Sequence, residues 1–221
     1  MDDISKKCYY GKMLETLDPL SISTIDVTPF EVYSKIPGEK CLIMTLEFDT
    51  TNFDTILFTL IDFEQPIFIK KGQLVHVLKK WGPEFKIEFD ITVKKAPSSW
   101  TNIIQFTIGG HVGQYGDRIP GIFLRPNSPE VTVCSAVSES YHMTCHNFDY
   151  LLNQKIHLVV KQYKDTGNKY RYEIEVNGST FHSVENQHAQ QFSNVIFYAC
   201  NPWDDCFTND FGLFENFKLF F

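Results

Sequence analysis

Residues 84–93 read EFKIEFDITV and alternate strictly between polar and apolar side chains. Every second residue is apolar, and this set comprises Phe85, Ile87, Phe89, Ile91 and Val93. Because successive side chains of a β-strand point to opposite faces, the alternation predicts a strand with one buried face and one solvated face. Such a strand is typical of a β-sandwich, in which each sheet packs one face against the core.

The rest of the chain consists of similar short runs separated by Gly, Pro, Asn and Asp. Aromatic residues make up 15% of the sequence, and no apolar stripe of helical period is sustained. Further strands are predicted at residues 41–48, 55–63, 102–108, 121–124, 131–137, 155–163, 170–176, 179–184, 194–200 and 214–221. One helix is predicted, at residues 5–17. We therefore expect an all-β protein folded as a two-sheet antiparallel β-sandwich.

Two turn sequences predict a meander of three strands near residue 170. The strands at 155–163 and 170–176 are separated by residues that tolerate positive φ, namely Asp165, Gly167 and Asn168. Asn177-Gly178 follows, and this dipeptide is the strongest short signal for a hairpin. The next strand is expected to begin directly after it.

The charge of the chain argues against several classes of partner. The formal net charge is -7 and no Lys/Arg block is present, whereas nucleic acids and anionic membranes require a concentrated basic face. No run approaches the roughly 18 apolar residues that cross a bilayer, and the first residues lack the apolar core of a signal peptide. We expect no nucleic-acid binding, no membrane insertion by this segment, and a neutral or cationic ligand.

Six cysteines favour an extracellular location. They fall into three pairs that are close in sequence, Cys8 with Cys41, Cys134 with Cys145, and Cys200 with Cys206. We predict three local disulfides and hence a secreted protein or the ectodomain of a cell-surface protein. Six reduced thiols in a cytosolic protein are the alternative. Asn177-Gly178-Ser179 is a glycosylation sequon, so the protein is expected to be a glycoprotein.

A possible domain boundary lies near residues 69–72. The prediction is an N-terminal β-rich segment at 1–71 and a jelly-roll domain at 72–221. The strands before the boundary are almost continuously apolar, as in strands buried on both faces, so they are also able to join the same sandwich.

An ordered set of landmarks between residues 72 and 221 resembles the laminin G-like, concanavalin A-like jelly-roll modules of secreted and cell-surface invertebrate proteins. The landmarks are FKIEFDI at 85–91, WTNIIQFTIGG at 100–110, GDRIPGIFL at 116–124, SVEN at 183–186, NVIFYACNPW at 194–203 and FENFKL at 214–219. The chain departs from the family pattern after Trp203, where Asp204-Asp205-Cys206 intervene. A disulfide between Cys200 and Cys206 would hold this loop.

The resemblance raises the question of catalysis, because jelly-roll glucanases use carboxylates in the order Glu-x-Asp-x-x-Glu on one strand. Glu88 and Asp90 begin this pattern, but Val93 occupies the third carboxylate position. The proton donor is therefore missing, and we predict that the protein is not an enzyme and has no catalytic residues.

Laminin G-like modules often bind calcium at the rim of the sandwich, and this cation takes six to eight oxygen ligands. No cofactor is required by the sequence, but calcium is a candidate, and its predicted ligands are Asp204, Asp205, Asn209 and Asp210, with Asp117 nearby. His142, Cys145 and His146 resemble a zinc site, yet a disulfide between Cys134 and Cys145 is the preferred reading.

Loops hold the predicted ligand-binding residues, because binding residues concentrate there. They are Tyr115, Asp117, Arg118 and Trp203. Trp81, Trp100 and Trp203 are also able to stack on a sugar face, but core packing is the favoured role for these tryptophans, and the landmark positions of Trp100 and Trp203 support it. The resemblance implies a non-catalytic, lectin-like recognition module that binds a glycan or a protein partner in cell adhesion. The alternatives are a self-associating ectodomain of a matrix or coat protein, and a glucanase.

Overall fold

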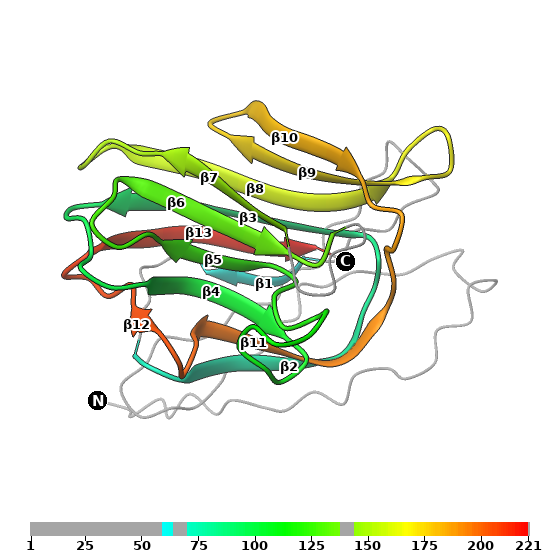
Figure 1. Ribbon diagram of the computed structural model, residues 1–221, viewed down its shortest axis with the longest axis horizontal. Helices are drawn as coiled ribbons and strands as arrows, with labels where there is room; N and C mark the ends of the chain where they lie inside the picture. Colours follow the sequence, from blue (N-terminus) through cyan, green and yellow to red (C-terminus); the bar gives the residue numbers. More distant parts are fainter. Residues whose placement is uncertain (1–58, 64–69, 138–143, 221) are drawn as a thin grey trace, which may run out of the picture.

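The computed structural model describes residues 59–63, 70–137 and 144–220. They form a β-sandwich of two packed sheets, which we name sheet A and sheet B (Figure 1). The predicted helix at 5–17, the strand at 41–48 and the Cys8–Cys41 pair lie outside the described residues. No helix in the described part is long and apolar enough to cross a membrane.

Sheet A has the strand order β1-β13-β3-β8-β9-β10 and is antiparallel throughout. Its strands are β1 (Thr59–Phe63), β3 (Phe85–Val93), β8 (Lys155–Lys164), β9 (Tyr170–Val176), β10 (Ser179–Glu185) and β13 (Gly212–Phe220). β1 precedes the predicted domain boundary and nevertheless pairs with β13, the last strand of the chain.

Sheet B has the order β2-β11-β4-β5-β6-β7, with the short strand β12 added in parallel beside β4. Its strands are β2 (Gln73–Trp81), β4 (Thr101–Thr107), β5 (Gly121–Leu124), β6 (Glu130–Ser135), β7 (Thr144–Asp149), β11 (Phe192–Cys200) and β12 (Asp205–Cys206). The runs β4–β7 in sheet B and β8–β10 in sheet A are meanders of neighbouring strands, and the first and last strands of the chain cross between the two sheets. This arrangement is the predicted two-sheet antiparallel sandwich.

The alternation in β3 produces the expected two faces. All five of its apolar residues are buried in the core, and Lys86, Glu88, Asp90 and Thr92 lie on the outer face of sheet A. Phe89 packs against Phe214 with ring centroids 5.1 Å apart. The core is thus an aromatic layer between the two sheets, in which each fully buried Phe contributes about 1.5–3 kcal/mol to folding.

The predicted meander is confirmed by β8, β9 and β10. Asn168 adopts φ 62°, and Asn177 and Gly178 adopt φ 52° and 76° in the turn between β9 and β10. Positive φ at both central residues is the requirement of the tight hairpin turn that Asn-Gly favours.

Three strands of sheet B were not predicted: the two-residue β12 beside β4, and β2 and β7 at the edges of the sheet. β2 has only Leu78 and Trp81 fully buried among its nine residues, and β7 has only Phe148. An edge strand needs few apolar residues and carries polar ones to avoid pairing with other chains, so its alternation is weak. The pattern at 73–81 and 144–149 was therefore not recognisable as a strand.

Candidate functional site

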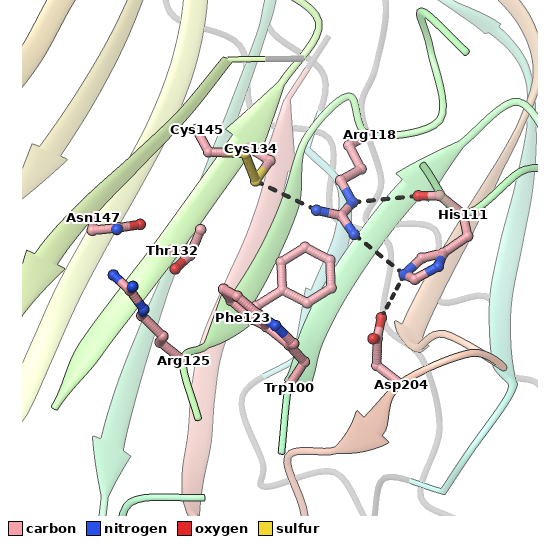
Figure 2. Close-up of a pocket in the computed structure, with 10 residues that line it drawn as sticks. All are labelled: Trp100, His111, Arg118, Phe123, Arg125, Thr132, Cys134, Cys145, Asn147 and Asp204. Atoms are coloured by element: carbon pink, nitrogen blue, oxygen red, sulfur yellow. Dashed lines mark hydrogen bonds and ion pairs between the residues drawn. A yellow bond between two sulfur atoms is a disulfide. The ribbon is translucent and has the colours of Figure 1, made fainter. Parts of the chain in front are cut away.

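A cavity of about 500 Å³ lies on the outer face of sheet B, away from the core (Figure 2). It is lined by Trp100, His111, Arg118, Phe123, Arg125, Thr132, Cys134, Cys145, Asn147 and Asp204. Figure 2 shows Arg118, His111 and Asp204 on one side, Arg125, Thr132 and Asn147 on the other, and Phe123 with Trp100 between them. An apolar surface flanked by a few polar groups is typical of small-molecule sites.

Phe123 on β5 forms the apolar floor of the pocket. Its side chain is 1% exposed although it does not belong to the core cluster, because other side chains cover it from outside. The Arg118 guanidinium lies over the ring at 4.3 Å, and Trp100 meets the ring edge-on at 6.4 Å. Trp100 itself is 45% exposed, so it presents an aromatic surface to solvent at the rim.

A chain of polar contacts joins Arg118, His111 and Asp204. His111 Nε2 lies 2.9 Å from Asp204 Oδ2 and 3.2 Å from Arg118 Nη2. A carboxylate only accepts hydrogen bonds, so Nε2 carries the proton that is donated to Asp204. This nitrogen therefore cannot accept a hydrogen bond from Arg118, and Nη2 has no acceptor there.

The remaining contacts of Arg118 leave its guanidinium incompletely satisfied. Nε donates to the His111 carbonyl oxygen at 3.3 Å, and Nη1 reaches only the weak acceptor Cys134 Sγ at 3.5 Å. Burial lowers the pKa of Arg118, while the charges of Asp204 and Asp117 raise it, and an arginine remains protonated under these conditions. Within the described part of the chain, this cation makes no ion pair with a carboxylate within bonding distance.

The loop that carries Asp204 is fixed by the fully buried Asn201. Asn201 Oδ1 accepts hydrogen bonds from the backbone N–H groups of Trp203 and Asp204, and its Nδ2 donates to Asp204 Oδ2 at 2.7 Å and to Gln105 Oε1 at 2.6 Å. The disulfide between Cys200 and Cys206 closes the same loop, as predicted. Asp204 is consequently held rigidly at the pocket.

The loop that carries His111 and Arg118 is held by buried polar groups. Gln105 donates to three backbone carbonyl oxygens of this loop, the shortest at 2.7 Å to Asp117. Asp117 Oδ2 accepts from the N–H groups of Gly113 and Gln114. A Cβ at Gly110 would lie 2.4 Å from Asp117 Oδ1, so only glycine fits at this position.

The opposite wall of the pocket belongs to β6 and β7. Their disulfide, Cys134–Cys145, was predicted from the sequence and lines the pocket. Four buried side-chain atoms lack a hydrogen-bond partner among the described residues, and Thr132 Oγ1 is the one that belongs to this pocket. A buried hydroxyl without a partner costs about 1–3 kcal/mol.

Two of the four predicted ligand-binding residues lie at the pocket, and two do not. Arg118 lines the pocket, and Trp203 lies beside it, stacked on His111 at 5.3 Å. Asp117 is buried and organises the loop, while Tyr115 packs on Phe192 and donates its hydroxyl hydrogen to backbone oxygens. Neither lines the pocket.

The expectation that Trp100 and Trp203 are packing residues is wrong, since they are 45% and 39% exposed. Trp81 is 1% exposed and does belong to the core. Sequence reasoning also missed His111 as a site residue, and this residue lies in the glycine-rich loop GGHVGQYG at 109–116. A histidine in such a loop between two strands of one sheet was the available signal.

The predicted calcium ligands make separate contacts with other residues. Asp204 bonds to His111 and Asn201, whereas Asp205 accepts from Ser99 Oγ. Asn209 contributes its carbonyl oxygen to Lys94, and Asp210 is exposed. No group of three or more His, Cys, Asp and Glu side chains with metal-binding geometry occurs among the described residues.

The predicted carboxylates of a glucanase lie on the outer face of sheet A. Asp90 accepts hydrogen bonds from His157, Asn216 and Lys155, and Lys155 also contacts Glu215 at 3.3 Å. Burial raises the pKa of Asp90, but these hydrogen bonds outweigh it and leave the pKa below its ordinary value. A general acid requires a raised pKa, so Asp90 is poorly suited to donate a proton. The third position, Val93, is fully buried.

The predicted glycosylation site, Asn177, is exposed at the turn between β9 and β10. Its Oδ1 accepts a hydrogen bond from the His157 backbone N–H at 2.9 Å.

No family model and no curated protein sequence matches this chain. Solved structures that resemble it include the binding domain of botulinum neurotoxin DC in complex with SialylT, with a TM-score of 0.42 and 15% identity over 62% of this chain and 32% of that chain. CBM40 of Ruminococcus gnavus IT-sialidase, bound to alpha2,3 sialyllactose, has a TM-score of 0.44 and 12% identity over 71% of this chain and 89% of that one. Sheep galectin-11 in complex with glycerol has a TM-score of 0.39 and 10% identity over 68% and 98%. The chain spans about a third of the length of the toxin domain.

Proposed function

We propose that the sheet B pocket binds a saccharide and that the chain is a non-catalytic, lectin-like recognition module. The observation that carries this proposal is the exposed Trp100 beside Arg118, a guanidinium whose hydrogen-bonding groups are incompletely satisfied among the described residues. A pyranose ring has one apolar C–H face and a rim of hydroxyls. The apolar face suits an aromatic platform, and the hydroxyls suit convergent donors and acceptors.

Preorganisation supports a binding role for this pocket. Both loops that supply its polar groups are held by buried side-chain hydrogen bonds, and one of them is closed by a disulfide. A rigid site loses little conformational entropy when a ligand binds. The two disulfides also support a location outside the cytosol, in a secreted protein or an ectodomain. Membership of the laminin G-like modules remains a prediction.

The test is a glycan array followed by titration calorimetry of the best ligand with Trp100→Ala. We expect Kd to rise at least tenfold, because the stacking platform is removed while the wall of the pocket remains. Phe181→Ala is the matched control, since Phe181 is also an aromatic side chain with 45% exposure but lies on β10 of sheet A. It should leave Kd unchanged.

Two outcomes would count against this proposal. Equal losses in both variants would show that the pocket is not the binding site. No glycan binding, together with concentration-dependent association in sedimentation velocity, would favour the self-associating ectodomain. A separate titration in the presence of EGTA tests calcium, and we expect no change in Kd, because Asp204 Oδ2 already accepts hydrogen bonds from Asn201 and His111.

A further inference from the structure

The charges around the pocket are balanced before any ligand enters. Two cations line it, Arg118 and Arg125. Arg125 already forms an ion pair with Glu130, whose Oε2 lies 3.1 Å from Arg125 Nη1. Arg118 lies within electrostatic reach of both Asp204 and Asp117. The site therefore has no excess of positive charge with which to attract an anion.

Asp204 opposes an anionic ligand directly. Its carboxylate is mostly buried, with 12% of the side chain exposed, and it lines the pocket beside Arg118. Its Oδ2 accepts from His111 and Asn201, and no hydrogen bond reaches Oδ1 among the described residues. A second carboxylate placed here would be repelled across a partly desolvated space, whereas a hydroxyl hydrogen would find an acceptor.

Arg118 and Asp204 together match the two capacities of a sugar hydroxyl. Such a group accepts one hydrogen bond and donates another, so adjacent hydroxyls can bridge the free donors of Arg118 and the free oxygen of Asp204. The Phe123 ring is already covered by the guanidinium, which leaves Trp100 as the available stacking surface.

We infer that the pocket takes an uncharged pyranoside and discriminates against the corresponding uronic acid, with Asp204 as the residue that determines this specificity. The inference rests on the proposed saccharide-binding function. It is also consistent with the net charge of the chain, which is -7 and disfavours the approach of anions.

The test uses pairs of probes that differ only at C6, where a hydroxymethyl group is replaced by a carboxylate. Methyl galactoside with methyl galacturonide, and methyl glucoside with methyl glucuronide, are titrated into the chain by calorimetry or by ligand-observed NMR. For the pair that binds, we expect the neutral member to have a Kd at least tenfold lower. This Kd should be unchanged between 50 mM and 500 mM NaCl, as expected for an uncharged ligand.

The variant Asp204→Asn removes the negative charge and keeps the size of the side chain. We expect the preference for the neutral probe to fall below threefold, through tighter binding of the uronic acid. Asp205→Asn is the matched control, because its carboxylate is the next residue but bonds to Ser99 instead of the pocket. It should retain the tenfold preference.

The outcomes separate this inference from the function on which it rests. If the uronic acid binds as tightly as the neutral sugar, or more tightly, in a Trp100-dependent manner, the inference is wrong and saccharide binding stands. If Asp204→Asn leaves the ratio unchanged, Asp204 does not set the specificity. If no probe and no array glycan binds in a Trp100-dependent manner, the proposed function itself fails.

Discussion

The outer faces of the two sheets both carry polar side chains, but these side chains differ in how many hydrogen-bond partners they have. On sheet A, Glu173 accepts hydrogen bonds from Tyr163 and Thr180 and pairs with Lys161, so that its carboxylate is fully used within the face. On sheet B, Arg118 lacks a carboxylate partner and Thr132 lacks any partner among the described residues. The first face is complete without a ligand, and the second is not.

This difference separates residues that stabilise the fold from residues available for binding. A polar group that already has its hydrogen bonds gains little from a ligand, because it would exchange one partner for another. A partly buried group without partners gains the whole hydrogen bond. Sheet A therefore serves as an internal control for sheet B: changes on sheet A should alter stability alone, and changes in the pocket should alter binding.

The largest effect on stability is expected for Asn201, which supports the loop of Asp204 without lining the pocket. Asn201→Ala removes hydrogen bonds to Gln105, Asp204 and two backbone N–H groups, all in a fully buried position. We expect a loss of about 3 kcal/mol in the free energy of unfolding, because several buried polar groups lose their partners together. Urea denaturation measures this loss, and saccharide binding should fall with it.

Asn209→Ala is the control for this prediction. Asn209 is exposed in the following loop, and its backbone oxygen accepts a hydrogen bond from Lys94. Its substitution should change the free energy of unfolding by less than about 0.5 kcal/mol. If the two variants are equally stable, the Asn201 network does not hold the pocket.

The sequence predicted the fold better than the pocket, for a physical reason. Alternation in β3 and the Asn-Gly turn are local signals, and local geometry determines what they form. The pocket instead depends on three segments far apart in the chain, which bring Trp100, Arg118 and Asp204 together on one face. Periodicity cannot show that an aromatic residue such as Trp100 points outward where a strand begins, or that Thr132 lacks a partner.

A smaller effect is expected on the face of sheet A. Burial raises the pKa of Glu173, but hydrogen bonds from Thr180 and Tyr163 and the charge of Lys161 outweigh it, so the pKa lies below its ordinary value of 4.5. Its contribution to stability is therefore present above pH 4.5 and is lost as the pH falls through the lowered pKa. Glu173→Gln should cost about 1–2 kcal/mol at pH 7 and progressively less below pH 4.5.

Calorimetric binding of the saccharide should be unaffected by Glu173→Gln, since this residue lies on the other sheet. A loss of affinity in a folded Glu173→Gln variant would show that the two faces are not independent. Equal stability of the variant and the unaltered chain at pH 7 would mean that the hydrogen bonds of this face contribute little.

The smallest effect on stability is expected at the β7–β10 edge, where the two sheets meet. His146 on β7 and His182 on β10 stack across the sandwich with ring centroids 3.6 Å apart, next to the Phe148–Phe181 contact. Burial lowers the pKa of both rings, and the charge of His182 lowers that of His146 further. The folded state thus favours neutral rings, whereas the unfolded chain takes up protons near pH 6.5. Stability should fall as the pH drops below 6.5, and this window lies above the one in which Glu173 acts.

His182→Phe keeps an aromatic ring at this edge and removes one proton-binding group. Between pH 7 and pH 5, we expect its melting temperature to fall by about 2 °C less than that of the unaltered chain. His188→Phe, at an exposed position before β11, should follow the unaltered chain. If the melting temperature of His182→Phe falls as much as that of the unaltered chain, the loss of stability between these pH values does not arise at the β7–β10 edge. The charged face of sheet A would then be its source.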